Sequence, residues 1–268
     1  MADTPPTLTE AVTRDVQTLL SGPPSTAALE RALRHLAKWR SQLIENTLVR
    51  KDGVEVQGGP FKGMAYPSRA TEGARVARLL GCYEATLAPV IEQAIARGYP
   101  LVIDIGCAEG YYAVGLATRM PGTRVMARDE NPRAMESCAA LAQANGVADR
   151  VELGGRFAHA DFDICRAQDT LVICDIEGAE DALLDPAQAP GLVHADILVE
   201  CHDGMVPGLS DRIARRFEAS HAVTRLNRAT DSSALPGWME TLGDLDRALA
   251  LWEWRAGPTP WLWMQRHG

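Results

Sequence analysis

Short, largely apolar runs follow one another at regular intervals after residue 100, and this spacing limits the folds that the chain can adopt. The runs are Leu101–Ile105, Arg124–Ala127, Val151–Leu153, Leu171–Cys174 and Asp196–Val199. Continuous rather than alternating apolarity indicates burial on both faces, as in a parallel sheet between helices. With two more strands near residues 221–228 and 261–265, the pattern predicts an α/β fold built on a doubly wound, mostly parallel, seven-stranded sheet.

Two helices should precede this sheet as an N-terminal helical extension. The Ser-Gly-Pro-Pro sequence at residues 21–24 separates them, and Ser25 or Thr26 can cap the second helix. Apolar positions of this helix recur at spacings of three and four: Leu29, Leu33, Leu36, Trp39 and Leu43. We expect this apolar face to pack against the rest of the chain as a helical lid, or against a second copy in a homodimer.

The charge balance excludes several classes of partner. There are 27 Lys and Arg residues against 35 Asp and Glu residues, a net charge of −8, so the chain lacks the basic surface of a nucleic-acid-binding protein. It also lacks the roughly 18–20 continuous apolar residues of a membrane span and begins without a secretory signal pattern. We therefore expect a cytoplasmic protein that binds a small molecule and neither nucleic acid nor a membrane.

A glycine turn ends the first strand of the predicted sheet, with the sequence Asp104-Ile105-Gly106-Cys107-Ala108-Glu109-Gly110. Gly106 would allow a ligand to lie against the backbone, and Gly110 would let the following helix approach the sheet. The spacing differs from the Gly-x-Gly-x-x-Gly of dinucleotide sites, which disfavours a dehydrogenase. An acidic side chain in the turn would repel a pyrophosphate but suits a cationic ligand that carries an amino acid.

This turn resembles the first motif of class I S-adenosylmethionine-dependent methyltransferases, and the resemblance extends over about residues 100–268. It implies a Rossmann-like fold with a set of cofactor-binding residues around the turn: Asp104, Gly106, Cys107, Ala108, Gly110 and Tyr111. Asp129, at the end of the second strand, is expected to accept the ribose hydroxyl groups, with Glu130 as the alternative. Asp161 and Phe162 are candidates for the adenine contacts.

Acidic residues also end the fourth and fifth strands, in Asp175-Ile176-Glu177-Gly178-Ala179-Glu180 and Glu200-Cys201-His202-Asp203. These runs are similar to those of FkbM-like methyltransferases, many of which modify hydroxyl groups on sugars and secondary metabolites. Residues 59–64 and 80–84 resemble signatures of bacterial relatives, with Cys82 where threonine is usual. The resemblance implies that Asp175 also contacts the cofactor and that four residues are candidates for substrate binding: Tyr83, Glu84, Glu177 and His221.

The acids at these two strand ends predict the chemistry of the site. Asp175, Glu200, His202 and Asp203 could together bind a divalent cation, for which oxygen ligands favour Mg²⁺, Ca²⁺ or Mn²⁺ over zinc. Such an ion would lower the pKa of a substrate hydroxyl group. Without a metal, His202 is the candidate general base. Asp175, Glu200 and His202 are therefore the candidate catalytic residues.

Together these observations predict three regions and one activity. Residues 1–52 form the helical extension, 53–98 a hairpin or loop and a helix on the substrate side, and 99–268 the S-adenosylmethionine-binding methyltransferase domain. The expected reaction is O-methylation of a hydroxyl group on a small metabolite or glycoside. The alternatives are methylation of a nitrogen or of a protein side chain, and a noncatalytic subunit that binds S-adenosylmethionine.

Overall fold

The structure, a computed structural model, describes residues 7–68 and 73–267, which fall into two compact units. One unit joins the N-terminal residues up to Gly53 with Leu235–Trp252, and the other joins Val54–Ala234 with the residues from Glu253 onward. Residues 235–252 thus group with the N-terminal helices, although the sequence places them in the ligand-binding domain. Residues 54–98 belong to the same unit as the sheet.

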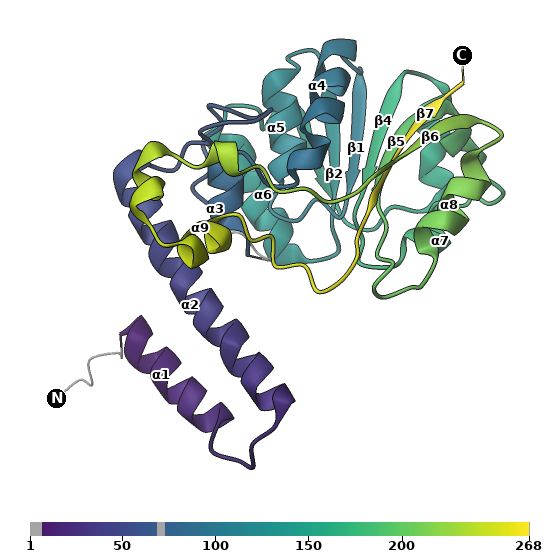
Figure 1. The fold of residues 1–268 in the computed structure, drawn as a ribbon. Coiled ribbons are helices and arrows are strands. Elements are labelled where there is room, and N and C mark those ends of the chain that lie inside the picture. The colour runs from purple at the N-terminus through teal and green to yellow at the C-terminus, as the bar shows by residue number, and fades with distance from the viewer. Residues whose placement is uncertain (1–6, 69–72, 268) are drawn as a thin grey trace. The chain divides into compact units, whose positions relative to one another are not determined.

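The larger unit contains the predicted seven-stranded sheet, with the strand order β3-β2-β1-β4-β5-β7-β6 (Figure 1). Its strands are β1 (Leu101–Ile105), β2 (Arg124–Arg128), β3 (Val151–Gly154), β4 (Thr170–Cys174), β5 (Ala195–Glu200), β6 (His221–Leu226) and β7 (Trp261–Arg266). β1 to β5 pair in parallel, and β7 runs antiparallel to both β5 and β6. The expectation of a mostly parallel α/β sheet is confirmed.

Helices cover both faces of this sheet, which explains why β1, β4 and β5 are buried along their whole length. Figure 1 shows α4, α5 and α6 on one side and α7 and α8 on the other. The helices of this unit are α3 (Arg75–Leu80), α4 (Ala88–Arg97), α5 (Tyr111–Arg119), α6 (Pro132–Ala144), α7 (Glu180–Leu183) and α8 (Leu209–Phe217), with 3₁₀ helices η1 (Ala85–Leu87), η2 (His159–Arg166), η3 (Pro190–His194) and η4 (Ser232–Ala234). The strand order reverses between β1 and β4, and in such sheets ligands bind at the carboxyl ends of the strands beside this point.

The smaller unit consists of α1 (Leu8–Leu19), α2 (Thr26–Asp52), η5 (Gly237–Thr241) and α9 (Asp244–Ala250). Ser25 caps α2 as predicted, because its hydroxyl accepts a hydrogen bond from the backbone N–H of Ala28. Arg40 of α2 donates two hydrogen bonds, from Nε at 2.6 Å and Nη2 at 2.5 Å, to the carboxylate of Asp246 in α9. Within the described residues, no helix combines the length and the apolarity needed to cross a membrane.

The expected packing face of α2 differs from the observed one. Leu29, Leu33 and Leu36 are 62%, 67% and 44% exposed to solvent in the chain described. The buried positions of α2 are two alanines in its first half, Ala28 and Ala32, and three residues in its second half, Ser41, Ile44 and Leu48. Spacing alone favoured the leucines because they are more hydrophobic, but small residues permit closer packing of helices.

Candidate functional site

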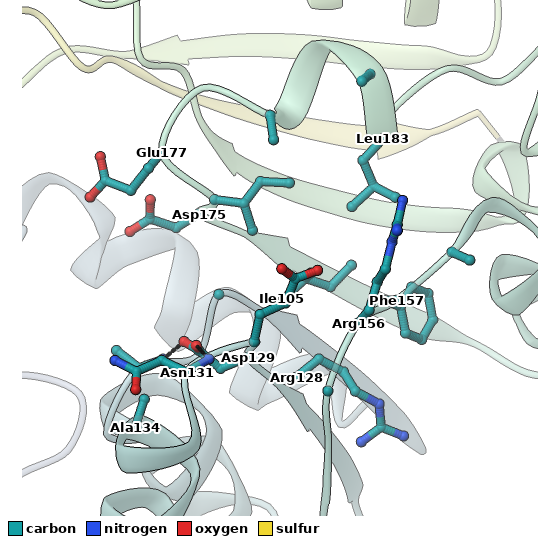
Figure 2. Close-up of a pocket in the computed structure, with 18 of the residues that line it drawn as sticks. Ile105, Arg128, Asp129, Asn131, Ala134, Arg156, Phe157, Asp175, Glu177 and Leu183 are labelled. Carbon is teal, nitrogen blue, oxygen red and sulfur yellow. Dashed lines mark hydrogen bonds between the residues drawn. The ribbon is translucent and has the colours of Figure 1, made fainter.

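A cavity of about 690 Å³ opens at the carboxyl ends of β1, β2 and β4, where the sequence predicts a cofactor (Figure 2). Its lining combines backbone of the glycine turn, acidic groups and apolar side chains. The residues are Ile105, Gly106, Ala108, Arg128, Asp129, Glu130, Asn131, Ala134, Gly155, Arg156, Phe157, Ala158, His159, Asp175, Ile176, Glu177, Ala179, Ala182 and Leu183. The cavity therefore offers both polar and apolar surface to a ligand.

The glycine turn is held by close contacts with its neighbours. Gly106 has φ +83°, and a Cβ at this position would overlap the carbonyl oxygen of Asp175. The Gly106 N–H donates to the carbonyl of Arg128 at 2.8 Å. Gly110 has φ +91°, and its close neighbour is the Cys138 side chain. Both glycines adopt a backbone conformation that favours glycine, and the close neighbour of Gly110 is a side chain of α6 rather than the sheet that the sequence suggested.

Asp129 lies at the end of β2 and faces the large cavity with Glu130. Its Oδ2 accepts the N–H of Ala108 at 3.0 Å, and its Oδ1 accepts the N–H of Asn131 at 2.7 Å. These bonds fix the carboxylate between the glycine turn and the β2–α6 loop. Asp129 is thus oriented toward the cavity by backbone groups.

Asp104 faces a second, smaller cavity of about 30 Å³. It is 3% exposed, and its Oδ2 has no hydrogen-bond partner among the described residues. Burial, together with the nearby Asp175 carboxylate, raises the pKa of Asp104 to about 7. Predicted residues of the glycine turn and its helix, such as Cys107 and Tyr111, line this cavity together with residues that were not predicted. The full lining is Arg78, Tyr83, Asp104, Gly106, Cys107, Ala108, Glu109, Tyr111, Tyr112, Ile173, Asp175 and Trp261.

A third cavity of about 340 Å³ lies at the ends of β4 and β5 and shares Asp175 and Glu177 with the large one. Carboxylates, one histidine and one arginine dominate its polar lining. The full set is Tyr83, Asp175, Glu177, Glu200, His202, Gly204, Met205, Glu253, Trp254, Arg255, Ala256, Gly257 and Thr259. We call this the acceptor cavity, because it contains the three candidate catalytic residues, Asp175, Glu200 and His202.

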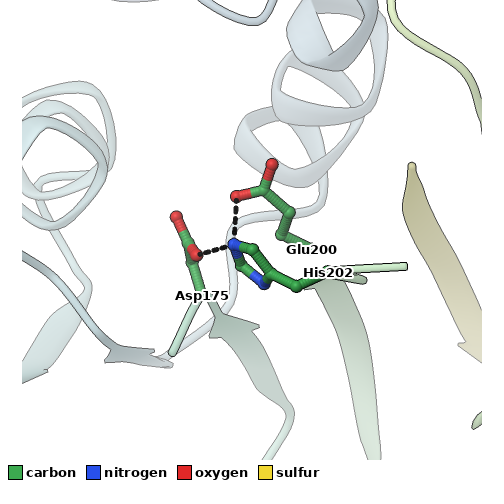
Figure 3. Close-up of side chains that lie close together, drawn as sticks. All are labelled: Asp175, Glu200 and His202. Atoms are coloured by element: carbon green, nitrogen blue, oxygen red, sulfur yellow. Dashed lines mark ion pairs between the residues drawn. The ribbon is translucent and has the colours of Figure 1, made fainter. Parts of the chain in front are cut away.

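His202 is the centre of the acidic cluster in this cavity (Figure 3). Its Nε2 lies 3.6 Å from Asp175 Oδ1, 3.3 Å from Glu177 Oε2 and 3.7 Å from Glu200 Oε2. Burial lowers the pKa of His202, but the hydrogen bond to Glu180 and the carboxylates of Asp175, Glu180 and Glu177 outweigh it, so the pKa is raised. The ring therefore gains a proton more readily than an exposed histidine.

The cluster also has the dimensions of a cation site. Candidate ligand atoms of Asp175, Glu200 and His202 all lie within 4.8 Å of one another. Ion-to-ligand distances of about 2.0–2.6 Å for Mg²⁺ or Ca²⁺ are compatible with this spacing. Three of the four predicted metal ligands are therefore brought together.

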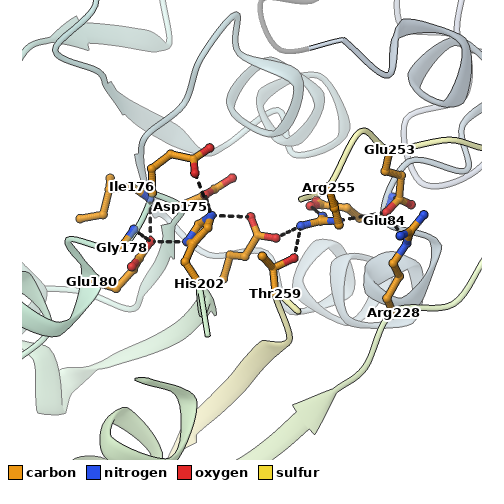
Figure 4. A network of polar contacts seen from close by, with 12 residues as sticks. Glu84, Asp175, Ile176, Gly178, Glu180, His202, Arg228, Glu253, Arg255 and Thr259 are labelled. Carbon is orange, nitrogen blue, oxygen red and sulfur yellow. Dashed lines mark hydrogen bonds and ion pairs between the residues drawn. The ribbon is translucent and has the colours of Figure 1, made fainter. Parts of the chain in front are cut away.

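Arg255 connects the acceptor cavity to a network of acids (Figure 4). Its guanidinium donates to Glu253 Oε2 at 3.1 Å and to Thr259 Oγ1 at 2.5 Å, and it forms ion pairs with Glu84 and Glu200. Burial and the nearby Glu84 carboxylate raise the pKa of Glu253 to about 7. Arg255 thus holds Glu200 at the edge of the cluster.

Of the predicted substrate residues Tyr83 and Glu84, only Tyr83 lines a cavity described above. Tyr83 lines both the small cavity and the acceptor cavity. Glu84 lines none of the three cavities described above, and instead binds Arg255 and accepts the hydroxyl of Tyr112. Glu84 therefore contributes by fixing its neighbours.

Asp203 and His221 do not join the site, which corrects their expected roles. The carboxylate of Asp203 accepts the N–H of Ser210 at 2.9 Å and its hydroxyl at 2.6 Å, and pairs with Arg225 at 3.2 Å. These bonds tie Asp203 to α8 and away from the proposed ion. His221 is buried at the start of β6, with Nε2 at 2.8 Å from the carbonyl oxygen of Ala195.

Asp161 and Phe162 do not line the large cavity either. The Asp161 carboxylate accepts the N–H of Ala158 at 2.7 Å, and Phe162 is fully buried in the core. Phe157 packs against Phe162, with ring centroids 4.9 Å apart, and it is Phe157 that faces the cavity. The residues after β3 that line the cavity thus precede the two predicted ones by a few positions, because the sequence does not specify the path of this loop to within a few residues.

Glu180 and Arg255 also belong to the site, although no role was predicted for either residue. Glu180 lies in the acidic run after β4, and its carboxylate forms a hydrogen bond with His202. Arg255 precedes β7 and belongs to no recognisable motif. Only the acidic run could have drawn attention to Glu180. Nothing in the sequence around Arg255 indicates its three carboxylate partners.

Comparisons with known proteins give a short sequence match and several distant folds. No family model matches the chain. It is 39% identical over 62 residues to the "Release factor glutamine methyltransferase" of Chlorobaculum tepidum, a match that covers 23% of this chain and 20% of that protein. The chain thus matches about one fifth of the length of this curated relative.

Two solved structures are similar over most of their length. One is the O-methyltransferase TomG from Streptomyces achromogenes in complex with SAM, with 15% identity, 96% of both chains covered and a TM-score of 0.45. The other is the O-methyltransferase from Bacillus cereus in complex with SAH, with 13% identity, 96% of this chain and 97% of that chain covered, and a TM-score of 0.43.

Proposed function

We propose that the protein is an S-adenosylmethionine-dependent methyltransferase that methylates a hydroxyl group of a small metabolite or glycoside. The observation that carries this proposal is the large cavity at the switch point of the sheet, with the glycine turn between two acids, Asp104 and Asp129. The short sequence match to a methyltransferase supports the same class of reaction. The finer similarity to FkbM-like methyltransferases is supported by the acidic runs after β4 and β5.

The residues of the two connected cavities fit the parts of this cofactor. Asp104, buried and with an oxygen that lacks a partner, would accept the ammonium of the methionine portion. Asp129 would accept the ribose hydroxyl groups, and Phe157 and Leu183 would contact the adenine ring. When bound, the cofactor supplies an electrophilic methyl group on a sulfonium.

The protein's own task is to align the acceptor and remove its proton. His202 is positioned for this in the acceptor cavity, where Nε2 would take the proton from the acceptor hydroxyl. Since Asp175 and Glu177 line both cavities, the acceptor would lie next to the cofactor. The surrounding carboxylates would stabilise the imidazolium that forms.

Replacement of Asp129 tests the cofactor site. Asp129→Ala should weaken binding of S-adenosylmethionine and S-adenosylhomocysteine alike by roughly one to two decades, because a charged hydrogen bond contributes about 1.5–3 kcal/mol. Titration calorimetry measures both affinities, and Glu130→Ala, which removes the alternative acid of the same cavity, should weaken binding less than Asp129→Ala. Equal affinities for wild type and Asp129→Ala would remove this residue from the site.

A divalent cation held by Asp175, Glu200 and His202 is a second candidate for activating the hydroxyl, and the spacing of their ligand atoms favours it. In that case exhaustive chelation should abolish turnover while leaving cofactor affinity unchanged, and Mg²⁺, Ca²⁺ or Mn²⁺ should restore activity. Elemental analysis of the purified protein is the companion measurement. Full turnover after chelation would leave His202 as the base without a metal.

The remaining alternatives are separated by an acceptor panel. Turnover with amines or peptides instead of hydroxyl compounds would support nitrogen or protein methylation. Cofactor binding without turnover on any acceptor would support a noncatalytic subunit.

A further inference from the structure

The geometry points to Glu180 as a positioning residue that fixes the ring orientation and tautomer of His202, leaving Nε2 free of hydrogen and facing the acceptor cavity. This inference deepens the proposed function and rests on it for the role of His202. Glu180 is fully buried, and its Oε1 lies 2.9 Å from His202 Nδ1.

The direction of this hydrogen bond follows from the other contacts of Glu180. The same Oε1 accepts two backbone N–H groups, which can only donate, so Oε1 is an acceptor oxygen. Nδ1 of His202 therefore carries the hydrogen and donates it to this oxygen. In the neutral ring the lone pair is then on Nε2.

Glu180 is itself held in place by the loop that follows β4. Its Oε1 also accepts the backbone N–H groups of Ile176 at 3.0 Å and Gly178 at 3.2 Å (Figure 4). Ile176 lines the large cavity. Oε1 of Glu180 therefore links the loop after β4, which lines the large cavity, to His202 after β5.

The other side of the ring faces the acceptor cavity, which His202 lines together with Asp175, Glu177 and Glu200. These three carboxylates lie 3.3–3.7 Å from Nε2, farther than the 2.9 Å between Nδ1 and Glu180. An acceptor hydroxyl or a cation in the cavity would meet the ring on this Nε2 side. Glu180 differs from these three acids because it contacts Nδ1 and lines none of the cavities described above.

Nitrogen-15 NMR of the histidine side chains tests the tautomer directly, independent of any activity. At a pH where the rings are neutral, His202 should carry its hydrogen on Nδ1, with its signals identified by their loss in His202→Gln. His221 is an internal control, because its Nε2 faces the carbonyl oxygen of Ala195 and should carry the hydrogen there. A hydrogen on Nε2 of His202 in the wild type would overturn the inference, whether or not Glu180 variants fold.

Two variants link this orientation to turnover. Glu180→Gln keeps an oxygen acceptor and should retain the Nδ1–H tautomer and most of the activity. Glu180→Ala should mix the tautomers and lower kcat by about 10²-fold, the lower end of the contribution of a positioned base, with KM for the acceptor nearly unchanged. A loss of cofactor affinity in Glu180→Ala with an unaltered His202 tautomer would assign Glu180 to the loop alone and contradict the inference.

Calorimetry separates this test from the test of the proposed function. If the wild type does not bind S-adenosylmethionine, the proposed function fails while the tautomer of His202 can still be as inferred. If it binds and turns over with the other tautomer, only the positioning role of Glu180 fails.

Discussion

Asp104 has a carboxyl group in an environment that opposes its ionisation. The side chain lies in a central strand, nearly without exposure, and the neighbouring Asp175 carboxylate adds repulsion to the cost of burial. Oδ2 of Asp104 has no hydrogen-bond partner in the part of the chain that the structure describes. A cationic group in the small cavity would supply both the partner and the compensating charge.

The affinity for S-adenosylmethionine should therefore depend on pH. Since the pKa of Asp104 is raised to about 7, the group is protonated below that pH in the free protein and must lose its proton to pair with an ammonium. Affinity should rise as the pH increases through about 7 and then level off, with proton release on binding below pH 7. Calorimetry in buffers of different ionisation enthalpy measures this release.

The variant Asp104→Asn should bind more weakly and lose this pH dependence. The same raised pKa gives the folded state a stability contribution at low pH that is lost as the pH rises through about 7, and Asn should remove that slope as well. An unchanged pH dependence of binding in Asp104→Asn would show that another group titrates.

Most residues of the proposed cofactor site could be picked out from sequence, because they are neighbours in one turn or stand directly at strand ends. Asp104, Gly106, Asp129 and Asp175 all line the two connected cavities. The acceptor side was less predictable, because its contacts join residues far apart in the chain. Arg255, which approaches Glu84 and Glu200, has no local signal in the sequence.

At the scale of elements, the hydrophobic pattern predicted the strands correctly but did not predict which positions of the long helix α2 are buried. A strand buried on both faces needs only a continuous apolar run, and each predicted run lies in an observed strand. A helix can place several alternative faces inward, and in α2 the face with Ala28 and Ala32 is buried while the leucine row is exposed. Side-chain size, as well as hydrophobicity, decides which face packs.

Substitutions in α2 should reflect this exposure. Leu33→Gln keeps helix propensity and should change the free energy of unfolding by less than about 0.5 kcal/mol, whereas Ile44→Ala, at a position 4% exposed, should lower it by about 2–5 kcal/mol. Urea denaturation measures both. A strong loss of stability in Leu33→Gln, together with a lower mass in solution, would contradict the prediction and support the homodimer expected from the leucine row.

At the scale of the molecule, the residues of the proposed site all belong to one of the two units. The three cavities are lined by residues between Arg78 and Leu183, by the end of β5 with the loop after it, and by the segment that leads into the first residue of β7. The smaller unit brings together the N-terminal helices and α9, which are separated by most of the sequence, through pairs such as Arg40 with Asp246. Its organisation therefore depends on contacts that are remote along the chain.

The sequence alone determined the strands, the glycine turn and the acids at the strand ends, because burial and backbone conformation leave their mark on adjacent residues. Only the tertiary structure decided which of these acids meet. The insertion of β7 between β5 and β6 brings Arg255 to Glu200, the loop after β4 brings Glu180 to His202, and α8 takes Asp203 away from them. The physical reason is that a contact between distant residues depends on strand order and loop path, which no local pattern of hydrophobicity or charge encodes.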